Sequence, residues 1–393
     1  MKQEKIWNKS YITLFLINLI VSTSFYMIST ALSKHLVHLG MTVTMAGSVI
    51  GSMSFASMLT RPVTGWVSDH LDRKILLSLS LAVNFLCVVG YGVCTNAMLY
   101  IVLRIFHGIA FGMVTTVTMV LISGCIPIGR MGEGMGYFGL AQTMAVAIGP
   151  SISLALYERV GSRNMFFASA GCIAVAFVGA MLMDTKTKAA GDRSENSKEI
   201  FTFRLQDFVA KEAIIFAVIT IAISSINGIE NGYIVLYAEQ FGISNVGWYF
   251  TISAFTLFFS RAVCSRLPDH IGFTKTLCLG LGSIIFALLI LSLAPVGHFT
   301  GALTAGSILK ALGVGTLQPA LQAATVQSVP PERRGAATST FYIGTDLGQF
   351  SAPIIAGSLI DSVGYVSMFR IYILPLFGVG VLYILLKTKK KNK

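Results

Sequence analysis

Among the charged residues that lie inside long apolar stretches of the sequence, the chemistry of four stands out first: Arg104, Glu230, Lys310 and Asp346. A charge inside an apolar helix is unfavourable unless it meets a partner or a water-filled cavity. Buried carboxylates bind protons closer to neutral pH than carboxylates in water do. We therefore expect Asp346, and after it Glu230, to bind and release protons, with Arg104 and Lys310 as their counter-ions. The alternative is that such ion pairs only hold helices together.

Uncharged polar side chains accompany these charges. Asn227 lies three residues before Glu230, on the same helical face, and glycines on either side of Glu230 are expected to bend or break that helix. Such residues either line a polar pocket or bond neighbouring helices. Two acids and two bases suit a zwitterionic or amphipathic organic molecule better than a bare ion, and Phe and Met side chains accept varied apolar groups. The pocket residues we expect are Asn18, Tyr26, Arg104, Gln142, Asn227, Lys310, Gln318, Tyr342 and Gln349.

The elements that position these side chains are predicted to be membrane spans. Hydrophobic residues make up 54% of the chain and charged residues 12%, against roughly 25% charged in soluble domains. A span needs about 20 mostly apolar residues. Twelve stretches meet this requirement, near residues 11–33, 44–66, 75–95, 98–126, 134–157, 165–183, 212–237, 246–267, 276–294, 302–327, 336–359 and 368–386.

The net charge of +12 is distributed unevenly between the two predicted faces of the membrane. If the N-terminus is cytoplasmic, nearly all Lys and Arg residues fall on cytoplasmic segments, and the other face carries only Lys34, Arg159, Arg163 and Arg370. Positive residues favour the cytoplasmic side. We therefore expect both termini in the cytoplasm, a location in the cell membrane, and anionic lipid rather than nucleic acid as the partner of the basic C-terminal tail.

The sequence contains an internal duplication. Residues 60–74 reappear at 260–272, so that Asp69 corresponds to Asp269 at an offset of 200, and residues 156–161 reappear at 359–364 at an offset of 203. Each copy holds six predicted spans. The expected fold is all-α, with twelve transmembrane helices in two six-helix bundles related by a pseudo-twofold axis. The predicted divisions are residues 1–183, a cytoplasmic linker at 184–211, and residues 212–393.

The loop after the second span carries a recognisable pattern. Gly65, Asp69, Arg73 and Lys74 resemble the signature loop of the major facilitator superfamily, except that Asp72 stands where that family has a second Gly. The resemblance implies that Asp69 faces the start of the eleventh span, and Asp269 the start of the fifth, as parts of a cytoplasmic gate. Alternatively, these charges only set the topology. The expected gating residues are Gly65, Asp69, Arg73, Lys74, Arg130, Gly149, Pro150, Asp269 and Arg333.

Two more motifs extend the resemblance. Arg104, Gly108 and Gly112 are similar to the second signature of the superfamily, and Gly149-Pro150 in the fifth span partly matches the motif of its proton-driven drug exporters. A Pro within a helix removes a backbone hydrogen bond and allows bending. The resemblance implies alternating access around a midplane site and favours export. A packing kink is the alternative.

Two smaller patterns concern the predicted non-cytoplasmic side. Gly47-x-x-x-Gly51 is a close-packing pattern of membrane helices. Glu158 and Asp361 are repeated acids at the outer ends of the fifth and eleventh spans, and Arg163 and Arg370 lie nearby. We expect these acids and bases to form ion pairs at the outer rim.

The sequence also narrows the class of function. It holds no nucleotide-binding P-loop, so ATP is not the expected energy source, and no motif of a membrane hydrolase or metalloprotease. Its six cysteines do not have metal-ligand spacing. We expect a monomeric, proton-coupled exporter of a small organic molecule, with no cofactor, no metal and no enzymatic activity. A proton symporter that imports a metabolite is the main alternative, and a transporter-like sensor or scaffold is a distant one.

Overall fold

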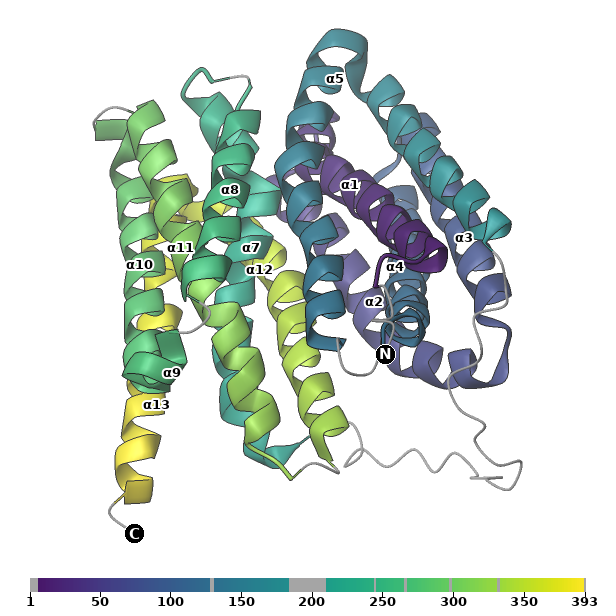
Figure 1. Ribbon diagram of the computed structural model, residues 1–393. Helices are drawn as coiled ribbons and strands as arrows, with labels where there is room; N and C mark the ends of the chain where they lie inside the picture. Colours follow the sequence, from purple (N-terminus) through teal and green to yellow (C-terminus); the bar gives the residue numbers. More distant parts are fainter. Residues whose placement is uncertain are drawn as a thin grey trace. The chain divides into compact units, whose positions relative to one another are not determined.

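The computed structural model describes residues 6–127, 131–183, 210–243, 245–264, 267–296, 299–330 and 333–391, and every regular element in these ranges is a helix (Figure 1). Among the described residues, eight helices or helix combinations are long and apolar enough to cross a membrane. Short 3-10 turns occur at Lys211–Ala213 and Ala294–Val296. The α-helices are α1 (Lys9–His38), α2 (Val43–His70), α3 (Arg73–Val93), α4 (Ala97–Cys125), α5 (Met131–Leu182), α7 (Ile214–Gln240), α8 (Gly247–Cys264), α9 (Leu267–Ile271), α10 (Phe273–Leu293), α11 (Phe299–Gln327), α12 (Arg334–Ile371) and α13 (Ile373–Lys391).

The duplication is visible in the helix lengths. Helices α3 and α10 both have 21 residues and begin 200 residues apart, and α4 and α11 both have 29 residues. Helices α5 and α12 are interrupted at Gly161 and Gly364, where φ is 81° and 79°. These glycines correspond at the offset of 203. A positive φ is readily adopted only by glycine, so both copies divide a long helix at the same point.

The turn before α3 explains the one departure from the signature loop. Asp72 has a φ of −59°, and its Oδ1 accepts hydrogen bonds from the backbone N–H groups of Lys74 at 2.8 Å and Ile75 at 3.1 Å. The corresponding Gly272 has a φ of 83° and no side-chain cap. The first copy therefore starts its helix with a carboxylate N-cap, where the second copy uses a left-handed glycine.

The chain forms two compact units. One consists of Met1–Ala31 and Ser52–Thr202, and the other of Leu32–Gly51 and Phe203–Lys393. In the first unit α3 packs on α4 and α5; in the second α7 lies along α12, and α11 packs on α8 and α10 (Figure 1). The predicted linker at 184–211 lies almost entirely outside the described residues, so the predicted division of the chain stays a prediction.

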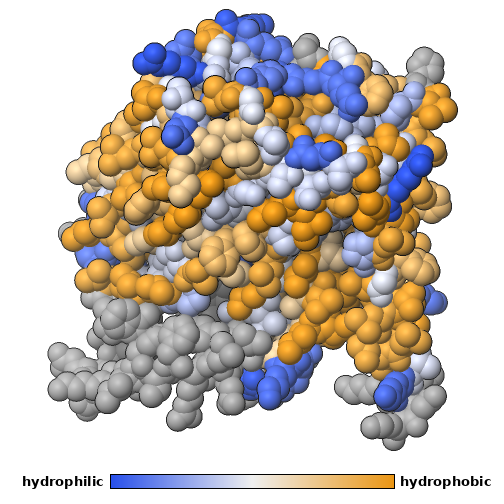
Figure 2. Space-filling model, turned by 180° about the vertical axis from the view of Figure 1, so that it is seen from behind, coloured by the Kyte–Doolittle hydropathy of each residue, from blue (hydrophilic) through white to orange (hydrophobic). Residues whose placement is uncertain are grey.

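Much of the surface is apolar. Hydrophobic side chains cover a large part of the face seen in Figure 2, while hydrophilic residues gather toward its ends. Leu182, Phe286 and Val263 are 77%, 61% and 74% exposed. Soluble proteins rarely expose large contiguous apolar patches, whereas lipid-facing helices must. The long apolar helices and this surface together describe a multi-pass membrane protein.

Candidate functional site

A buried ion pair joins α7 and α11 in the second unit. The ammonium of Lys310 contacts Oε2 of Glu230, and the two side chains are 12% and 8% exposed. The predicted pairing of these residues is therefore observed. The ring of Tyr249 on α8 is fully buried and its hydroxyl interacts electrostatically with the Glu230 carboxylate. Three helices thus converge on one buried carboxylate.

Asp346 is the second buried acid of this unit, at 6% exposure on α12. Gly344 and Gly348 on either side of it press against α7: a Cβ at Gly344 would lie 2.8 Å from the carbonyl oxygen of Ala217, and one at Gly348 2.5 Å from that of Ile221. Asp346 is two residues, or about 200° of helical rotation, from each glycine. Its side chain therefore leaves α12 away from the α7 contact, where it takes part in a further interaction.

Arg104 is buried in the first unit, with 1% exposure on α4. Its guanidinium donates to the sulfur of Met53 at 2.9 Å and lies 5.9 Å from the ring centre of Tyr91. The Tyr91 hydroxyl also shares a hydrogen bond of 3.0 Å with Nδ1 of His107. In the part of the chain the structure describes, Arg104 meets aromatic and sulfur groups instead of a carboxylate, an environment in which a cation is held by polarisable partners.

The glycines of the second signature bring α4 against α2. A Cβ added at Gly108 would lie 2.9 Å from Cβ of Ala56, and one at Gly112 would lie 3.0 Å from Oγ of Ser57. Both distances are too short for a larger residue without movement of the neighbouring helix. The spacing Arg104-x-x-x-Gly108-x-x-x-Gly112 therefore fixes the depth at which Arg104 is held.

The uncharged residues expected in the pocket differ in their surroundings and fall into three groups. Gln318 is engaged, because its side-chain oxygen accepts a hydrogen bond of 2.9 Å from Arg261 on α8. Gln142 on α5 is exposed. The others are half-buried along α1, α7 and α12: Asn18, Tyr26, Asn227, Tyr342 and Gln349.

Two participants were not expected from sequence. Tyr249 lies in a run of aromatic residues that is typical of a core, so nothing indicated its contact with Glu230. Arg261 is the repeat counterpart of Arg61, but that correspondence did not indicate its hydrogen bond to Gln318.

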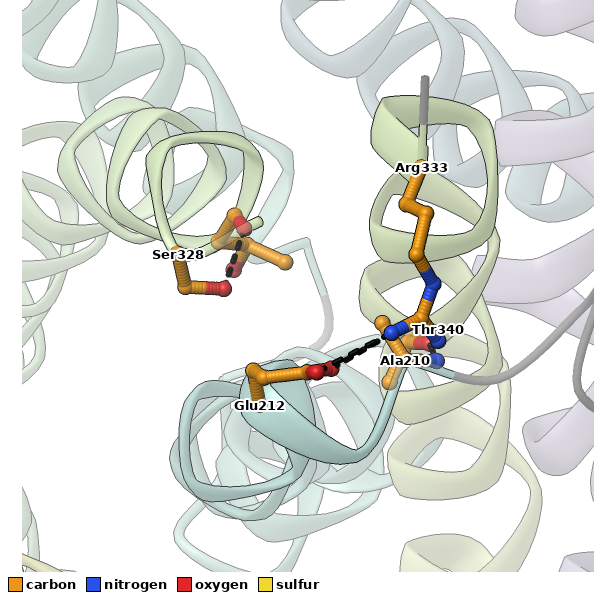
Figure 3. A network of polar contacts seen from close by, with 6 residues as sticks. Ala210, Glu212, Ser328, Arg333 and Thr340 are labelled. Carbon is orange, nitrogen blue, oxygen red and sulfur yellow. Dashed lines mark hydrogen bonds and ion pairs between the residues drawn. The ribbon is translucent and has the colours of Figure 1, made fainter. Parts of the chain in front are cut away.

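The charges expected at a gate are partly described. Arg333, at the start of α12, forms an ion pair with Glu212 at 3.0 Å, beside a hydrogen bond of 2.9 Å from the N–H of Ala210 to Thr340 (Figure 3). Nζ of Lys74 donates a hydrogen bond of 2.7 Å to the carbonyl of Met183, the residue that follows α5. Each of these contacts ties helix ends together within its own unit: the first two in the second unit, and the Lys74 contact in the first.

The remaining residues expected at the gate lie in the turn between α2 and α3, in α5, and partly outside the described residues. Nε of Arg73 donates to the carbonyl of Ser68 at 2.9 Å, which closes the turn between α2 and α3. Pro150 is buried, and a Cβ at Gly149 would lie 2.8 Å from Cβ of Tyr26, so α5 touches α1 there. Arg130 and the side chains of Asp69 and Asp269 lie outside the described residues, so their predicted contacts and the gating role of Gly65 stay predictions.

Comparison with known proteins gives consistent results. The family model of the Major Facilitator Superfamily matches residues 14–305 and 231–393. The staphylopine export protein of Staphylococcus aureus is 23% identical, with 85% of each chain covered, and the multidrug resistance protein MdtG of Escherichia coli is 23% identical, with 93% of this chain and 91% of MdtG covered. The crystal structure of the nucleoside transporter NupG superposes with a TM-score of 0.79 at 13% identity, covering 98% of this chain and all of NupG. These relatives are transporters and not enzymes, and the chain belongs to the Major Facilitator Superfamily.

Proposed function

We propose that this transporter is a proton-coupled exporter of a small amphipathic or zwitterionic organic solute. The observation that carries the proposal is the buried Glu230–Lys310 pair in the same unit as the buried Asp346. A buried ion pair is often no more stabilising than a well-packed apolar pair, so its presence in a transporter favours a role in binding.

The chemistry of the pair suggests the kind of solute. A zwitterion carries an ammonium that can replace Lys310 beside Glu230, and a carboxylate that can replace Glu230 beside Lys310. Such an exchange keeps every buried charge partnered. A bare cation or anion would leave one of the two residues unpaired, which is strongly unfavourable in a dry interior.

We assign proton coupling to Asp346 first and to Glu230 second. Asp346 is set apart from the ion pair by its position on α12, and intramembrane acids commonly serve as proton sites. Protonation of Asp346 would change the charge of its surroundings and so bias the transporter toward one of its two states.

The proposed topology has twelve spans, six from each repeat, with both termini cytoplasmic. Helix α5 has 52 residues, more than twice the length needed to cross the roughly 30 Å apolar core of a bilayer at about 1.5 Å per residue. Four helices of each half are already separate: α1 to α4 in the first, and α7, α8, α10 and α11 in the second. Division of α5 at Gly161, and of α12 with α13 at Gly364, supplies the fifth and sixth crossings of each half. The monomeric state is part of the proposal.

Two arguments favour export over import. The staphylopine export protein is named for outward transport, and the Gly149-Pro150 pair in α5 partly matches the motif of proton-driven drug exporters. Uptake by proton symport would use the same buried charges but has neither argument in its favour.

The test uses inside-out membrane vesicles that contain the full chain and are energised to an acidic lumen. A pH-sensitive dye reports proton release when amphipathic cations and zwitterionic amino-acid derivatives are added in turn, after a thermal-shift screen of the purified protein against the same compounds. The wild type should release protons with at least one compound, and Asp346→Asn should not. Glu158→Gln, which neutralises an exposed acid, is the matched control. Undiminished pH-driven transport by Asp346→Asn would remove Asp346 from the mechanism.

A further inference from the structure

The hairpin between α1 and α2, residues 32–51, belongs to the first repeat in sequence but packs with helices of the second. It falls in the same compact unit as α7 and α12. Three separate sets of contacts hold it there. All three lie within this unit, and none of them includes the buried charges assigned to transport.

The first contact is a carboxylate at a helix terminus. Asp361 of α12 accepts hydrogen bonds from the N–H groups of Val43 at 3.3 Å and Thr44 at 2.8 Å, and from Oγ1 of Thr44 at 2.6 Å. The first N–H groups of a helix lack internal partners and carry partial positive charge. Asp361 thus caps α2 from a different helix. The expected rim pair of Asp361 with Arg370 is wrong: within the described residues Asp361 bonds α2 instead, because its carboxylate reaches two N–H groups and a hydroxyl at once.

The second contact is an ion pair near the end of α1. Nζ of Lys34 lies 2.5 Å from Oε1 of Glu239 on α7, with side-chain exposures of 5% and 22%, and His38 lies 4.0 Å from the same carboxylate. The hairpin is therefore attached to α7 as well as to α12.

The third contact is made by glycines. A Cβ at Gly51 would lie 2.5 Å from the carbonyl oxygen of Phe350, and one at Gly357 would lie 2.7 Å from that of Val43. The hydroxyl of Tyr233 donates to the carbonyl of Pro353 at the same level. The Gly47-x-x-x-Gly51 pattern therefore serves to bring the backbone of α2 against that of α12.

We propose that the Asp361 contact on α2, together with the Lys34–Glu239 pair, is a releasable latch between the two sequence repeats. Glycine faces can separate without withdrawing interlocked side chains. Asp361 is exposed, so water can replace its hydrogen-bond partners when the carboxylate separates from α2. A charge-assisted contact of this kind is of moderate strength, which suits a contact that forms in one state of a transport cycle and breaks in the other.

Among the residues that the structure describes, the latch contacts occur in one copy of the repeat and not at the corresponding acid of the other. Glu158 occupies the position that corresponds to Asp361, yet it is exposed and makes no side-chain hydrogen bond or ion pair within the described residues. Neutralising Glu158 therefore changes the same charge at the equivalent place without touching the latch, which makes it the matched control.

The experiment measures the distance between spin labels by pulsed electron resonance in nanodiscs, with the full chain, no solute and no pH gradient. The labels replace Leu39 in the hairpin and Val296 after α10, which are 42% and 87% exposed, and are attached through bio-orthogonal amino acids so that the native cysteines remain. The latch idea rests on the proposed alternation between two states, but this measurement needs no transport. A lack of transport and a lack of latching are therefore separate results.

Asp361→Asn should raise the ratio of long-distance to short-distance populations about tenfold, as expected when a charge is removed from a helix N-terminus and its hydrogen bonds are weakened. Thr44→Val, which removes only the hydroxyl donor, should shift the ratio in the same direction by less. Glu158→Gln should match the wild type. The latch is overturned if the Asp361→Asn distribution equals that of the wild type, or if Glu158→Gln shifts it equally; should Asp361→Asn fail to fold, an unchanged Thr44→Val decides against it.

Discussion

A double-mutant cycle on Glu230 and Lys310 tests whether the buried pair behaves as one unit. Lys310→Met removes the cation and leaves the Glu230 carboxylate, which is 8% exposed, without its ion-pair partner. Breaking one side of a buried pair costs about 3–5 kcal/mol. Because the Tyr249 hydroxyl remains near the carboxylate, we expect Lys310→Met to lower the free energy of unfolding by about 3 kcal/mol, the lower end of this range.

The combined variant Glu230→Gln with Lys310→Met should be far less affected. It leaves no buried charge, and replacement of a buried pair by neutral groups of similar volume is often close to neutral for stability. With each single change at about 3 kcal/mol and the double change within about 1 kcal/mol of wild type, the coupling energy is about 5 kcal/mol. Solute transport should nevertheless be lost in the double variant, because the groups proposed to bind the solute are gone.

The assay is unfolding of the four purified proteins in one detergent at one pH, with solute transport measured in parallel. The exposed pair of Arg333 and Glu212 supplies a matched control, since its side chains are 39% and 47% exposed. Screening by solvent limits the coupling energy of such exposed pairs to about 0.2–1 kcal/mol. A coupling energy for Glu230 and Lys310 no larger than that of the exposed pair would refute the reasoning, and a double variant that still transports would show that the pair is only structural.

Two further predictions concern helix contacts. Gly108→Leu should lower the unfolding temperature sharply, because even its first side-chain carbon would come within 2.9 Å of Cβ of Ala56 on α2, and overpacking lowers the free energy of unfolding by about 1–3 kcal/mol or more. Gly139→Ala is the control, since nothing lies within 4 Å of a Cβ built there, and it should leave the unfolding temperature unchanged or slightly higher. Equal losses in both variants would show that α4 and α2 are not in tight contact. Asp72→Ala should lower the free energy of unfolding by about 1 kcal/mol through loss of the α3 N-cap, while Asp72→Asn should retain most of the stabilisation by the cap. Hydrogen exchange of the amides at the start of α3 would report the difference. Identical protection in both variants would contradict the capping role.

Much of the fold was predictable because it depends on local composition and on repetition. The apolar stretches, the matching lengths of α3 and α10, and the glycine breaks in α5 and α12 all follow from patterns that can be read along the chain. The Glu230–Lys310 pair was also predictable, because two opposite charges at similar depths in apolar helices have few other partners.

Other contacts could not be predicted because they join residues that the sequence does not relate. Asp361 was expected to pair with Arg370, which is nearby in sequence, but it caps α2 more than three hundred residues away. Likewise, the approach of Tyr249 to Glu230 depends on how α8 packs against α7 and α11, and an aromatic residue in an aromatic run gives no sign of such a contact.

By itself, the sequence determined that this chain is a duplicated, membrane-spanning helical protein with a small number of buried charges, because lipid accepts only apolar helices and makes each exception conspicuous. Only the tertiary structure decided that Tyr249 joins the Glu230–Lys310 pair, that Arg104 is held by Met53 and Tyr91, and that the α1–α2 hairpin packs on α7 and α12. Those outcomes depend on which helix faces meet, and a spacing such as Gly108-x-x-x-Gly112 does not say which helix will pack against it.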